Sequence, residues 1–436
     1  MSDSVQKAEA FLNKRGIAPE TVDMEQLLAT FLLEMEHGLS DENASSLKMI
    51  PTYTKVVSDI PKNEPVIVLD AGGTNFRTCL VTFDDEGVAH IEDFRKVSMP
   101  GVKKEVSAQE FFSTFADEVE RLIDKSDKIG FCFSYAAAIT ADHDGIPLVF
   151  SKEVKAPEVI GKPVGASLLQ ELSRRGYDVS RKKVAVLNDT VATLLAGQSA
   201  KSDVPYSGYI GFILGTGTNT AYVEKNDAIR KLDLTDSGSQ IINIESGNFD
   251  FCPSELDREF FQATKAPGQY HLEKMISGAY LGPLSTMVIE KAIEDGVFSG
   301  TFKERFSKLG GVNTTVMSNY LEMPFNTEYE LVACCDGNNE DAVALWMIID
   351  ALIARSAKLT AANLAATVLK SGAGTDPRIP ICINADGTTF YKTENLKKYT
   401  EYYLHTYLQL QRRRYYRFVH IDDSPTLGAA IAGLSL

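Results

Sequence analysis

The stretch VIVLDAGGTNFRTCLVTF, residues 66–83, contains an apolar run, a turn of glycines with Thr and Asn, and a second strand-like run. The stretch YIGFILGTGTNTAYVE, residues 209–224, has the same plan. Two strand-forming runs joined by a glycine-containing turn predict a β-hairpin. One such hairpin in each half of the chain predicts two related domains with a cleft between them.

Outward from the hairpins, the chain alternates between strand-like and helix-like segments. A strand is expected near 130–134, a helix near 166–174 and another strand at 183–187. The apolar run 341–372 predicts a long buried helix that Gly372 ends. This alternation is typical of an α/β protein.

The length of 436 residues is too great for one core and favours two or more domains. We expect a helical segment at 1–65, a small domain at 66–200 and a large domain at 201–436. The first segment is expected to pack on the large domain, and the last helix can return to the small one.

The composition, with 44% hydrophobic and 24% charged residues, is that of an ordinary globular protein. A net charge of −15 argues against broad binding of nucleic acid or anionic lipid, although a small anionic ligand remains compatible with it. The six cysteines are scattered and the histidines show no metal spacing, which predicts reduced thiols and no zinc site. The pair Cys334 and Cys335 is expected at a packed strand end. Without an apolar signal segment or membrane-spanning run, the sequence predicts a cytoplasmic protein.

The two hairpin turns are candidate phosphate sites. Glycine lets a backbone approach a ligand closely, and turn N–H groups with Thr hydroxyls form a concave site for phosphate oxygens. One such turn alone is more simply a tight hairpin without a ligand. Because the plan occurs twice, a phosphate site built from both domains is the better explanation.

A candidate catalytic carboxylate follows the strand in VAVLNDTVATLLAG, residues 184–197. Asp189 or Thr190 is expected to cap the helix that starts there, and capping alone would account for an Asp at this position. The end of a strand in an open α/β sheet is also where ligand clefts form. Asp189 there could accept a proton from a hydroxyl that attacks phosphorus.

Two further polar groups can join it. Asn243 and Glu245 are two residues apart on an expected strand and so on one face, and Gln269 and Glu273 are one turn apart if their segment is helical. Each pair alone is typical of a solvated face. Together with Asn188 and Asp189 they supply the carboxylates and amides that hydrogen-bond the hydroxyls of a sugar.

Taken together, these motifs resemble those of the eukaryotic-type hexokinase and glucokinase family, within the actin-like ATPase superfamily. The resemblance runs in collinear order from about residue 66 to the C-terminus through LDAGGTNFR, GFCFS, LVFSKEV, LNDTVATLLAG, ILGTGTNTAY, INIESGNF and PGQYHLEKMISGAYLG. It implies two actin-like, ribonuclease H-like α/β domains around a central cleft. It also implies phosphoryl transfer from MgATP to the 6-hydroxyl of a hexose, with glucose the expected sugar.

The resemblance also implies a role for each matching residue. Asp189 would be the general base, assisted by Lys152 and Arg77. The sugar would be held by Ser134, Ser151, Lys152, Asn188, Asp189, Asn243, Glu245, Gln269 and Glu273. Phosphates and Mg2+ would face Asp70, Gly72, Gly73, Thr74, Asn75, Arg77, Gly215, Thr216, Gly217 and Thr218, with Asp70 acting on the metal through water. The adenosine would lie near Gly372, Gly374, Thr375, Ser424 and Gly428.

The chain departs from the family pattern around the sugar. Ser134 is followed by Tyr135 and Ala136, without the usual proline, and a tryptophan-threonine-lysine-glycine pattern is replaced by FSKE at 150–153. These changes leave the preferred hexose open, as the sequence also leaves the oligomeric state. Two rival interpretations are a catalytically silent sugar sensor and an actin-like ATPase that binds a protein. All of the proposed phosphate and base residues are present, which argues against the first, and the sugar-contact set is unnecessary for the second.

Overall fold

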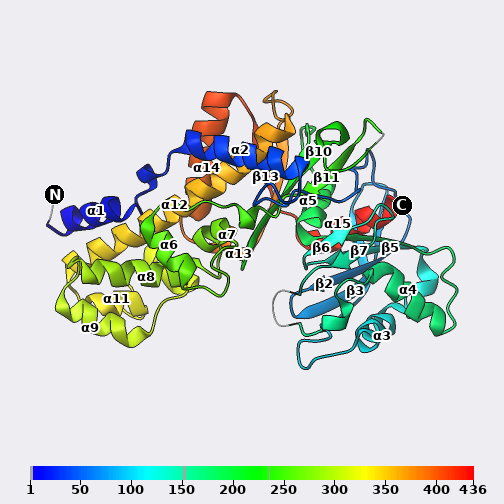
Figure 1. Cartoon of the computed structure of the whole chain (residues 1–436), viewed down its shortest axis with the longest axis horizontal. Coiled ribbons are helices and arrows are strands. Elements are labelled where there is room, and N and C mark those ends of the chain that lie inside the picture. The colour runs from blue at the N-terminus through cyan, green and yellow to red at the C-terminus, as the bar shows by residue number, and fades with distance from the viewer. Residues whose placement is uncertain (1–2, 151–153, 235) are drawn as a thin grey trace.

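The computed structural model describes residues 3–150, 154–234 and 236–436. Two lobes, each built around its own sheet, lie side by side (Figure 1). Within the described residues, no helix combines the length and apolar character needed to cross a membrane.

The smaller lobe contains a five-stranded sheet in the order β4-β3-β2-β5-β8. Its strands are β2 (Val66–Gly72), β3 (Asn75–Phe83), β4 (Ala89–Ser98), β5 (Lys128–Phe133) and β8 (Lys183–Leu187). The first three form an antiparallel meander, and β5 and β8 extend it in parallel from β2. The expected strand at 183–187 is confirmed to the residue.

The larger lobe repeats this plan. Its sheet has the order β1-β11-β10-β9-β12-β13, in which β9 pairs antiparallel with β10 and parallel with β12. Its strands are β1 (Ile50–Pro51), β9 (Tyr209–Leu214), β10 (Thr218–Lys225), β11 (Ser239–Asn243), β12 (Ile381–Asp386) and β13 (Tyr416–Val419). Apart from the short β1, the two sheets therefore share one topology, as the repeated hairpin motif predicts.

Helices cover the sheets. In the smaller lobe they are α3 (Ala108–Val119) and α4 (Val164–Arg174), beside the small hairpin of β6 (Ala137–Ile139) and β7 (Gly145–Pro147). In the larger lobe they are α1 (Asp3–Arg15), α2 (Met24–Ser40), α6 (Glu255–Gln262), α7 (His271–Ile276), α8 (Leu281–Glu294), α9 (Gly300–Leu309), α10 (Thr314–Glu322), α11 (Glu330–Cys335), α12 (Asn339–Ser371), α13 (Thr388–Lys392) and α14 (Leu396–Leu404). Short helical turns lie at Pro19–Thr21, Ile123–Lys125, Pro157–Val159, Gly197–Ser199, Asn226–Ala228, Ser246–Asn248 (η6) and His405–Leu410.

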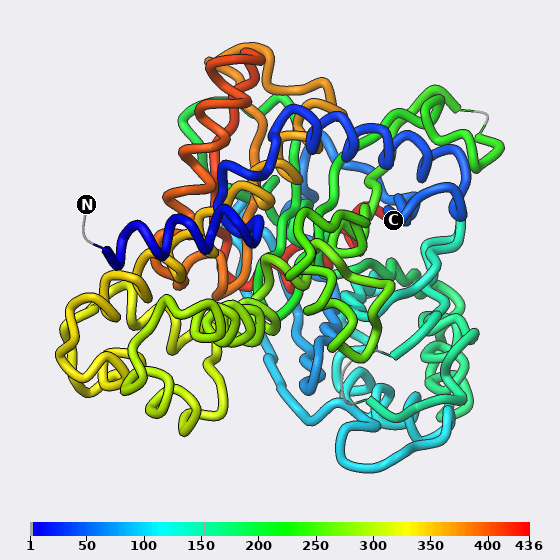
Figure 2. Tube along the Cα trace, turned by 60° about the vertical axis from the view of Figure 1, so that its left-hand side comes forward, coloured from blue at the N-terminus to red at the C-terminus, as the bar shows by residue number. Residues whose placement is uncertain are grey.

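Helix α12 forms the spine of the larger lobe. The side chain of Asn338 caps its start by accepting from the N–H groups of Glu340 and Asp341. Its C-cap, Gly372, has a φ of +70°, a conformation that glycine adopts without strain. The N-terminal helices α1 and α2 pack along α12, as Figure 2 shows in blue beside yellow and orange. Cys334 and Cys335, expected at a strand end, instead end helix α11, because a short apolar run does not distinguish the two structures.

Two helices lie where the lobes meet. These are α5 (Asp189–Ala196) and the last helix, α15 (Ser424–Leu434), which packs on α5, β2 and β5. The contact is backbone to backbone: a Cβ on Gly428 would lie 1.9 Å from the carbonyl oxygen of Ala192. A Cβ on Gly130 would likewise lie 1.8 Å from that of Ala429. Glycine at both positions therefore allows α15 to approach the sheet and α5.

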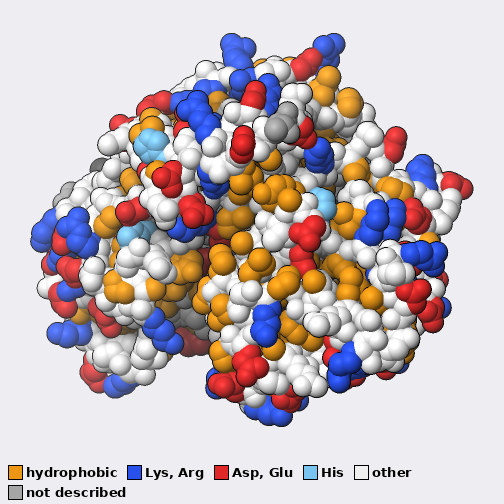
Figure 3. All heavy atoms as spheres, turned by 45° about the vertical axis from the view of Figure 1, so that its right-hand side comes forward, with side chains coloured by type: hydrophobic (Ala, Val, Ile, Leu, Met, Phe, Trp, Pro, Cys, Tyr) orange, Lys and Arg blue, Asp and Glu red, His pale blue; other side chains and the backbone are white. Residues whose placement is uncertain are grey.

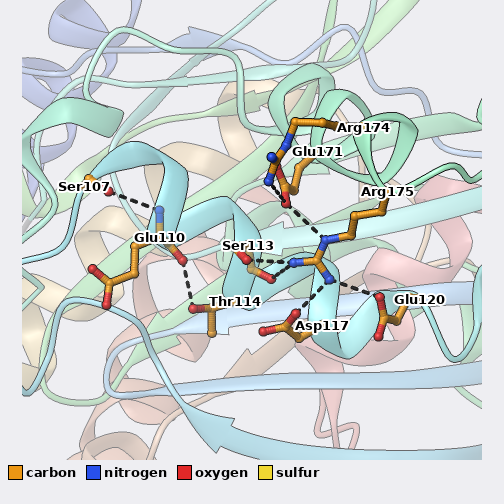
Figure 4. Close-up of polar contacts among 9 residues, drawn as sticks. All are labelled: Ser107, Glu110, Ser113, Thr114, Asp117, Glu120, Glu171, Arg174 and Arg175. Carbon is orange, nitrogen blue, oxygen red and sulfur yellow. Dashed lines mark hydrogen bonds and ion pairs between the residues drawn. The ribbon is translucent and has the colours of Figure 1, made fainter.

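One arginine joins the two outer helices of the smaller lobe (Figure 4). Arg175, which follows α4, donates to the carboxylates of Asp117 and Glu120 on and after α3, at 2.7 and 3.0 Å. It also donates to Glu171 on its own helix and to both oxygens of Ser113. These bonds fix α4 against α3 on the side of the lobe away from α15.

Candidate active site

The first glycine turn joins β2 to β3. Gly73 has a φ of +53°, and its carbonyl accepts a hydrogen bond from the hydroxyl of Tyr135 at 2.7 Å. Asp70 and Arg77 are cross-strand partners in this hairpin, and their side chains form an ion pair. A Cβ on Gly72 would lie 3.2 Å from Asp70 Oδ1 and 3.6 Å from Ser134 Oγ. The turn is therefore close to the carboxylate and to the expected sugar residue Ser134.

The other residues of this turn are less enclosed. Thr74 is exposed and Asn75 is half-buried, and Asn75 donates to Thr74 Oγ1 at 3.2 Å. No neighbouring atom lies within 4 Å of the position of a Cβ on Gly73. The structure thus leaves room for a ligand beside this backbone.

The second glycine turn joins β9 to β10. Gly215 accepts hydrogen bonds from Gly278 N at 2.9 Å and from Thr389 Oγ1 at 2.8 Å, and its own N–H donates to Gly217 O at 2.9 Å. Thr216 is exposed, while Thr218 is buried and bonds Ile213 O. Neighbouring segments therefore hold this turn firmly and leave its tip open.

Asp189 lies at the carboxyl end of β8, as the first residue of α5. The expected cap was Asp189 or Thr190, and that prediction is wrong. Asn188 caps the helix, with its Oδ1 accepting from Thr190 N at 2.9 Å. The cap therefore does not use the Asp189 carboxylate, whose one hydrogen bond among the described residues comes from the Thr190 hydroxyl at 3.4 Å.

An array of amides and a carboxylate extends from the larger sheet. Asn243 Nδ2 donates to Glu245 Oε1 at 2.8 Å, so the two side chains meet as expected. The expected strand is too long, however: β11 ends at Asn243, and Glu245 adopts a left-handed conformation with a φ of +56°. Asn219 in β10 donates to Asn243 Oδ1 at 2.8 Å and to Glu245 Oε1 at 3.3 Å.

Sequence reasoning assigned no role to Asn219. A signal was present, because the Thr-Asn pair of its hairpin matches Thr74 and Asn75 in the first hairpin. Only the pairing of β10 with β11 shows that Asn219 reaches the other two side chains.

Glu273 joins the array from α7. Its Oε2 accepts a hydrogen bond from the backbone N–H of Thr218 at 3.0 Å, and it would lie 2.7 Å from a Cβ on Gly217. The helix begins at His271, so Gln269 lies in the preceding turn and not one helical turn from Glu273 as expected. Proline and glycine at 267 and 268 explain the late start.

The carboxylates influence one another. Burial raises the pKa of Glu245, and the negative charges of Asp189 and Glu273 raise it further, whereas hydrogen bonds from Asn243 and Asn219 lower it. The carboxylates of Asp189 in α5, of Glu245 just before η6 and of Glu273 in α7 are therefore near enough for their charges to interact. Asn188 and Asn243, from different lobes, also line one small cavity of about 10 Å³.

A wider cleft of about 960 Å³ opens from this region and is lined by Glu245 and Gln269 on one side and by Ala136, Leu148 and Val149 on another. Figure 3 shows the surface hollowed between the lobes, with hydrophobic side chains along the hollow. Ser151 and Lys152, expected at the sugar, lie outside the described residues.

The residues expected near adenosine divide into two groups. Gly372 and Thr375 are exposed after α12, while Gly374 is buried and its N–H donates to Ser207 Oγ, just before β9, at 2.9 Å. Ser424 is buried and bonded to Asn384 and Ile421, and Gly428 faces α5. The Ser424 side chain and the Cα of Gly428 are thus occupied by packing contacts within the protein. A nucleotide contact from this segment would come from its other backbone atoms.

The donor set fits a phosphate-bound Mg2+. Among the described residues, no cluster of three or more His, Cys, Asp or Glu side chains is arranged to hold a metal. Mg2+ commonly takes one or two carboxylates with phosphate oxygens and water, and needs no all-protein cage. Asp70 beside the first glycine turn supplies such a carboxylate.

The fold is that of two-domain, actin-like sugar kinases. The structure superposes on a hexokinase from Schistosoma mansoni complexed with glucose, with a TM-score of 0.76, 24% identity and full coverage of both chains. A second hexokinase crystal structure gives a TM-score of 0.78 at 23% identity, also over both full chains. The expected fold class is confirmed.

Two family models, both described as hexokinase, match residues 11–199 and 209–435. The chain belongs to the hexokinase family. It is 30% identical over 454 residues to Hexokinase-2 of Homo sapiens, an alignment that covers 98% of this chain and 48% of the relative. It is 29% identical over 366 residues to Hexokinase-7 of Oryza sativa subsp. japonica, covering 78% of each. The chain thus spans about half the length of the mammalian relatives it matches.

Proposed function

We propose that this protein is an ATP-dependent hexokinase that transfers the γ-phosphoryl group of MgATP to the 6-hydroxyl of a hexose, with glucose the expected substrate. The observation that carries the proposal is the hydrogen-bonded array of Asn219, Asn243 and Glu245, with Glu273 bonded to the second glycine turn. The charge of Asp189 is near enough to raise the pKa of Glu245. Several hydrogen-bond acceptors in one site suit a ligand with several hydroxyl donors.

Asp189 is the proposed general base. It lies at the carboxyl end of β8, where an open α/β sheet presents ligands, and its carboxylate is not used as the helix cap. In the proposed reaction it takes the proton of the 6-hydroxyl as that oxygen attacks phosphorus. A positioned base of this kind contributes about 10²–10⁴ in rate.

The remaining site residues divide between the substrates. Glu245, Glu273, Asn188 and Asn243 would orient the sugar, together with Asn219 and the earlier candidates Ser134, Ser151, Lys152 and Gln269. The glycine turns at 72–75 and 215–218 would hold phosphate oxygens, and Arg77 would add positive charge beside Asp70. In the second turn the N–H groups of Gly215 and Thr218 already donate to Gly217 O and Glu273 Oε2, so the backbone donors there would come from Thr216 and Gly217. A bound Mg2+ would neutralise phosphate charge, with Asp70 reaching it through water.

Closure of the lobes on the sugar would exclude water, which is a smaller competing nucleophile. We place the hinge near residues 190–210. Residues up to Ala196 belong to α5, so bending within this range falls to the segment that connects Gly197 to Tyr209.

The test measures ADP release with MgATP and glucose, mannose, fructose, glucosamine or no sugar, beside Asp189→Ala. Sugar-dependent release that falls at least about 100-fold in the variant, while calorimetry shows retained sugar binding, is the expected result. Sugar binding without turnover would instead identify a sensor. ADP release that no sugar stimulates would identify an ATPase of another kind.

A further inference from the structure

Asn363 is an amide buried in the middle of α12. It is fully buried, and the helix around it is apolar on most faces. Asn is a poor helix former, and a buried amide is costly unless it is hydrogen-bonded. Its Oδ1 has no hydrogen-bond partner among the described residues. Stability alone therefore gives no reason for Asn at this position.

The other end of the amide makes a definite contact. Asn363 Nδ2 donates to Thr220 Oγ1 in β10 at 2.8 Å, and Thr220 Oγ1 lies 3.1 Å from Ser246 Oγ in η6. Because Thr220 accepts from Asn363, its own proton can go to Ser246. A chain of two hydrogen bonds thus links α12 to the segment that follows Glu245.

Asn219 ties this chain to the sugar site. Its Oδ1 accepts from the backbone N–H groups of Thr220 at 2.7 Å and Ser246 at 3.2 Å. Its Nδ2 must then point the other way, and it donates to Asn243 and Glu245. Asn363 bonds the side chain of Thr220, which in turn contacts that of Ser246. The backbone N–H groups of these same two residues, Thr220 and Ser246, orient the Asn219 amide.

We propose that Asn363 is a positioning residue for sugar recognition, acting through Thr220 and Ser246 on Asn219 and the Glu245 carboxylate. The inference rests on the proposed function. Glu245 has a left-handed backbone, which a non-glycine residue keeps only when its surroundings hold it. The bonds at Thr220 and Ser246 supply that support from the rigid α12.

The test compares Asn363→Ala with wild type and with Ser356→Ala. Ser356 lies two helical turns earlier on α12, is equally buried, and its hydroxyl has no hydrogen-bond partner among the described residues. Asn363→Ala should raise the Kd and KM for glucose about tenfold, the size expected for one misplaced hydrogen bond, while KM for ATP stays unchanged. Ser356→Ala should change neither.

A second readout does not need the sugar. Carbon-13 NMR titration of the Glu245 carboxyl should give a higher pKa in Asn363→Ala, because Asn219 then donates less well to it. Asp189, Glu273 and the phenol of Tyr270 also interact with this carboxyl, and they are the same in both proteins. A merely structural role for Asn363 would leave this titration unmoved.

Variants at Thr220 provide an independent test if Asn363→Ala does not fold. Thr220→Val keeps the shape but breaks the chain, and Thr220→Ser restores the hydroxyl. The same loss of glucose affinity in Thr220→Val, with recovery in Thr220→Ser, is expected. Unchanged glucose affinity and an unchanged Glu245 titration in both disruptive variants would overturn the inference. If the wild type binds no hexose, the proposed function is overturned. If the wild type and the variants bind glucose with equal affinity, only the positioning role of Asn363 is overturned.

Discussion

The carboxylate of Glu273 accepts a hydrogen bond from the backbone N–H of Thr218 at 3.0 Å. This bond joins the candidate sugar site in α7 to the second glycine turn. Because Oε2 would lie only 2.7 Å from a Cβ on Gly217, the contact depends on glycine at that position. A residue proposed to hold sugar is thus in direct contact with a turn proposed to hold phosphate, so a change in one should shift the other.

Gly217→Ala should therefore weaken both functions of the site. The new methyl group displaces the end of the Glu273 side chain, which then loses Thr218 N, and we expect glucose affinity to fall about tenfold. Calorimetry with glucose and initial rates measure this. Gly300→Ala is the matched control, since no atom lies within 4 Å of its Cβ position. Normal glucose binding by Gly217→Ala would contradict the coupling.

Protonation of Glu245 should set the pH below which glucose affinity falls. Its pKa is raised, chiefly by burial, and only the ionised carboxylate accepts hydrogen bonds with both oxygens. As pH falls, Glu245 takes up its proton at a higher pH than an ordinary Glu, so glucose affinity should fall there. Calorimetric titrations across pH test this, and Glu245→Gln should bind weakly at every pH without that fall. An affinity that holds steady down to the ordinary range of Glu would contradict it.

The same shift predicts an effect on stability. A carboxyl whose pKa is raised on folding destabilises the folded state when both states are ionised. This cost shrinks as pH falls below the folded pKa and is gone below the unfolded pKa. Glu245→Gln removes the buried charge, so its melting temperature should exceed that of wild type at neutral pH. The difference should shrink in acid. Thermal unfolding at both pH values measures it, and a lower melting temperature at neutral pH would refute the argument.

Asp257 and Arg355 form a fully buried ion pair between α6 and α12, with the two terminal guanidinium nitrogens each 2.8 Å from a carboxylate oxygen. Asp257→Ala leaves the Arg355 charge buried and unpaired, and should destabilise the protein by about 3–5 kcal/mol. Denaturant unfolding measures this. Asp376→Ala breaks the exposed pair with Arg378 and should leave the transition in place. Equal effects of the two variants would count against a buried role.

The hydrogen bonds of Arg175 should stabilise the packing of α4 against α3 in the smaller lobe. Arg175→Ala removes charged hydrogen bonds that join α4 to α3, and should destabilise that lobe by roughly 1–3 kcal/mol. Hydrogen exchange of α3 and α4 amides reports it locally. Arg174→Ala, which removes an exposed arginine bonded only to Glu171, should have a smaller effect. Loss of protection confined to the larger lobe would show that the junction lies elsewhere.

Much of this molecule is readable from local pattern. The hairpins at 66–83 and 209–224, the strand at 183–187 and the long helix ending at Gly372 all follow from hydrophobic period and glycine placement. Errors fall where local signals are weak. The helix cap at Asn188, the start of α7 at His271 and the helix at Cys334 and Cys335 depend on one or two residues each.

The sequence by itself therefore determined two hairpins of one plan, an α/β chain in two halves, and a carboxylate after a strand. These features arise from interactions between near neighbours in the chain. Only the tertiary structure decided that Asn219 meets Glu245, that Glu273 bonds Thr218, and that Asn363 reaches Thr220. Those contacts join residues from 26 to 143 positions apart, and no local period specifies which distant side chains a folded backbone brings together.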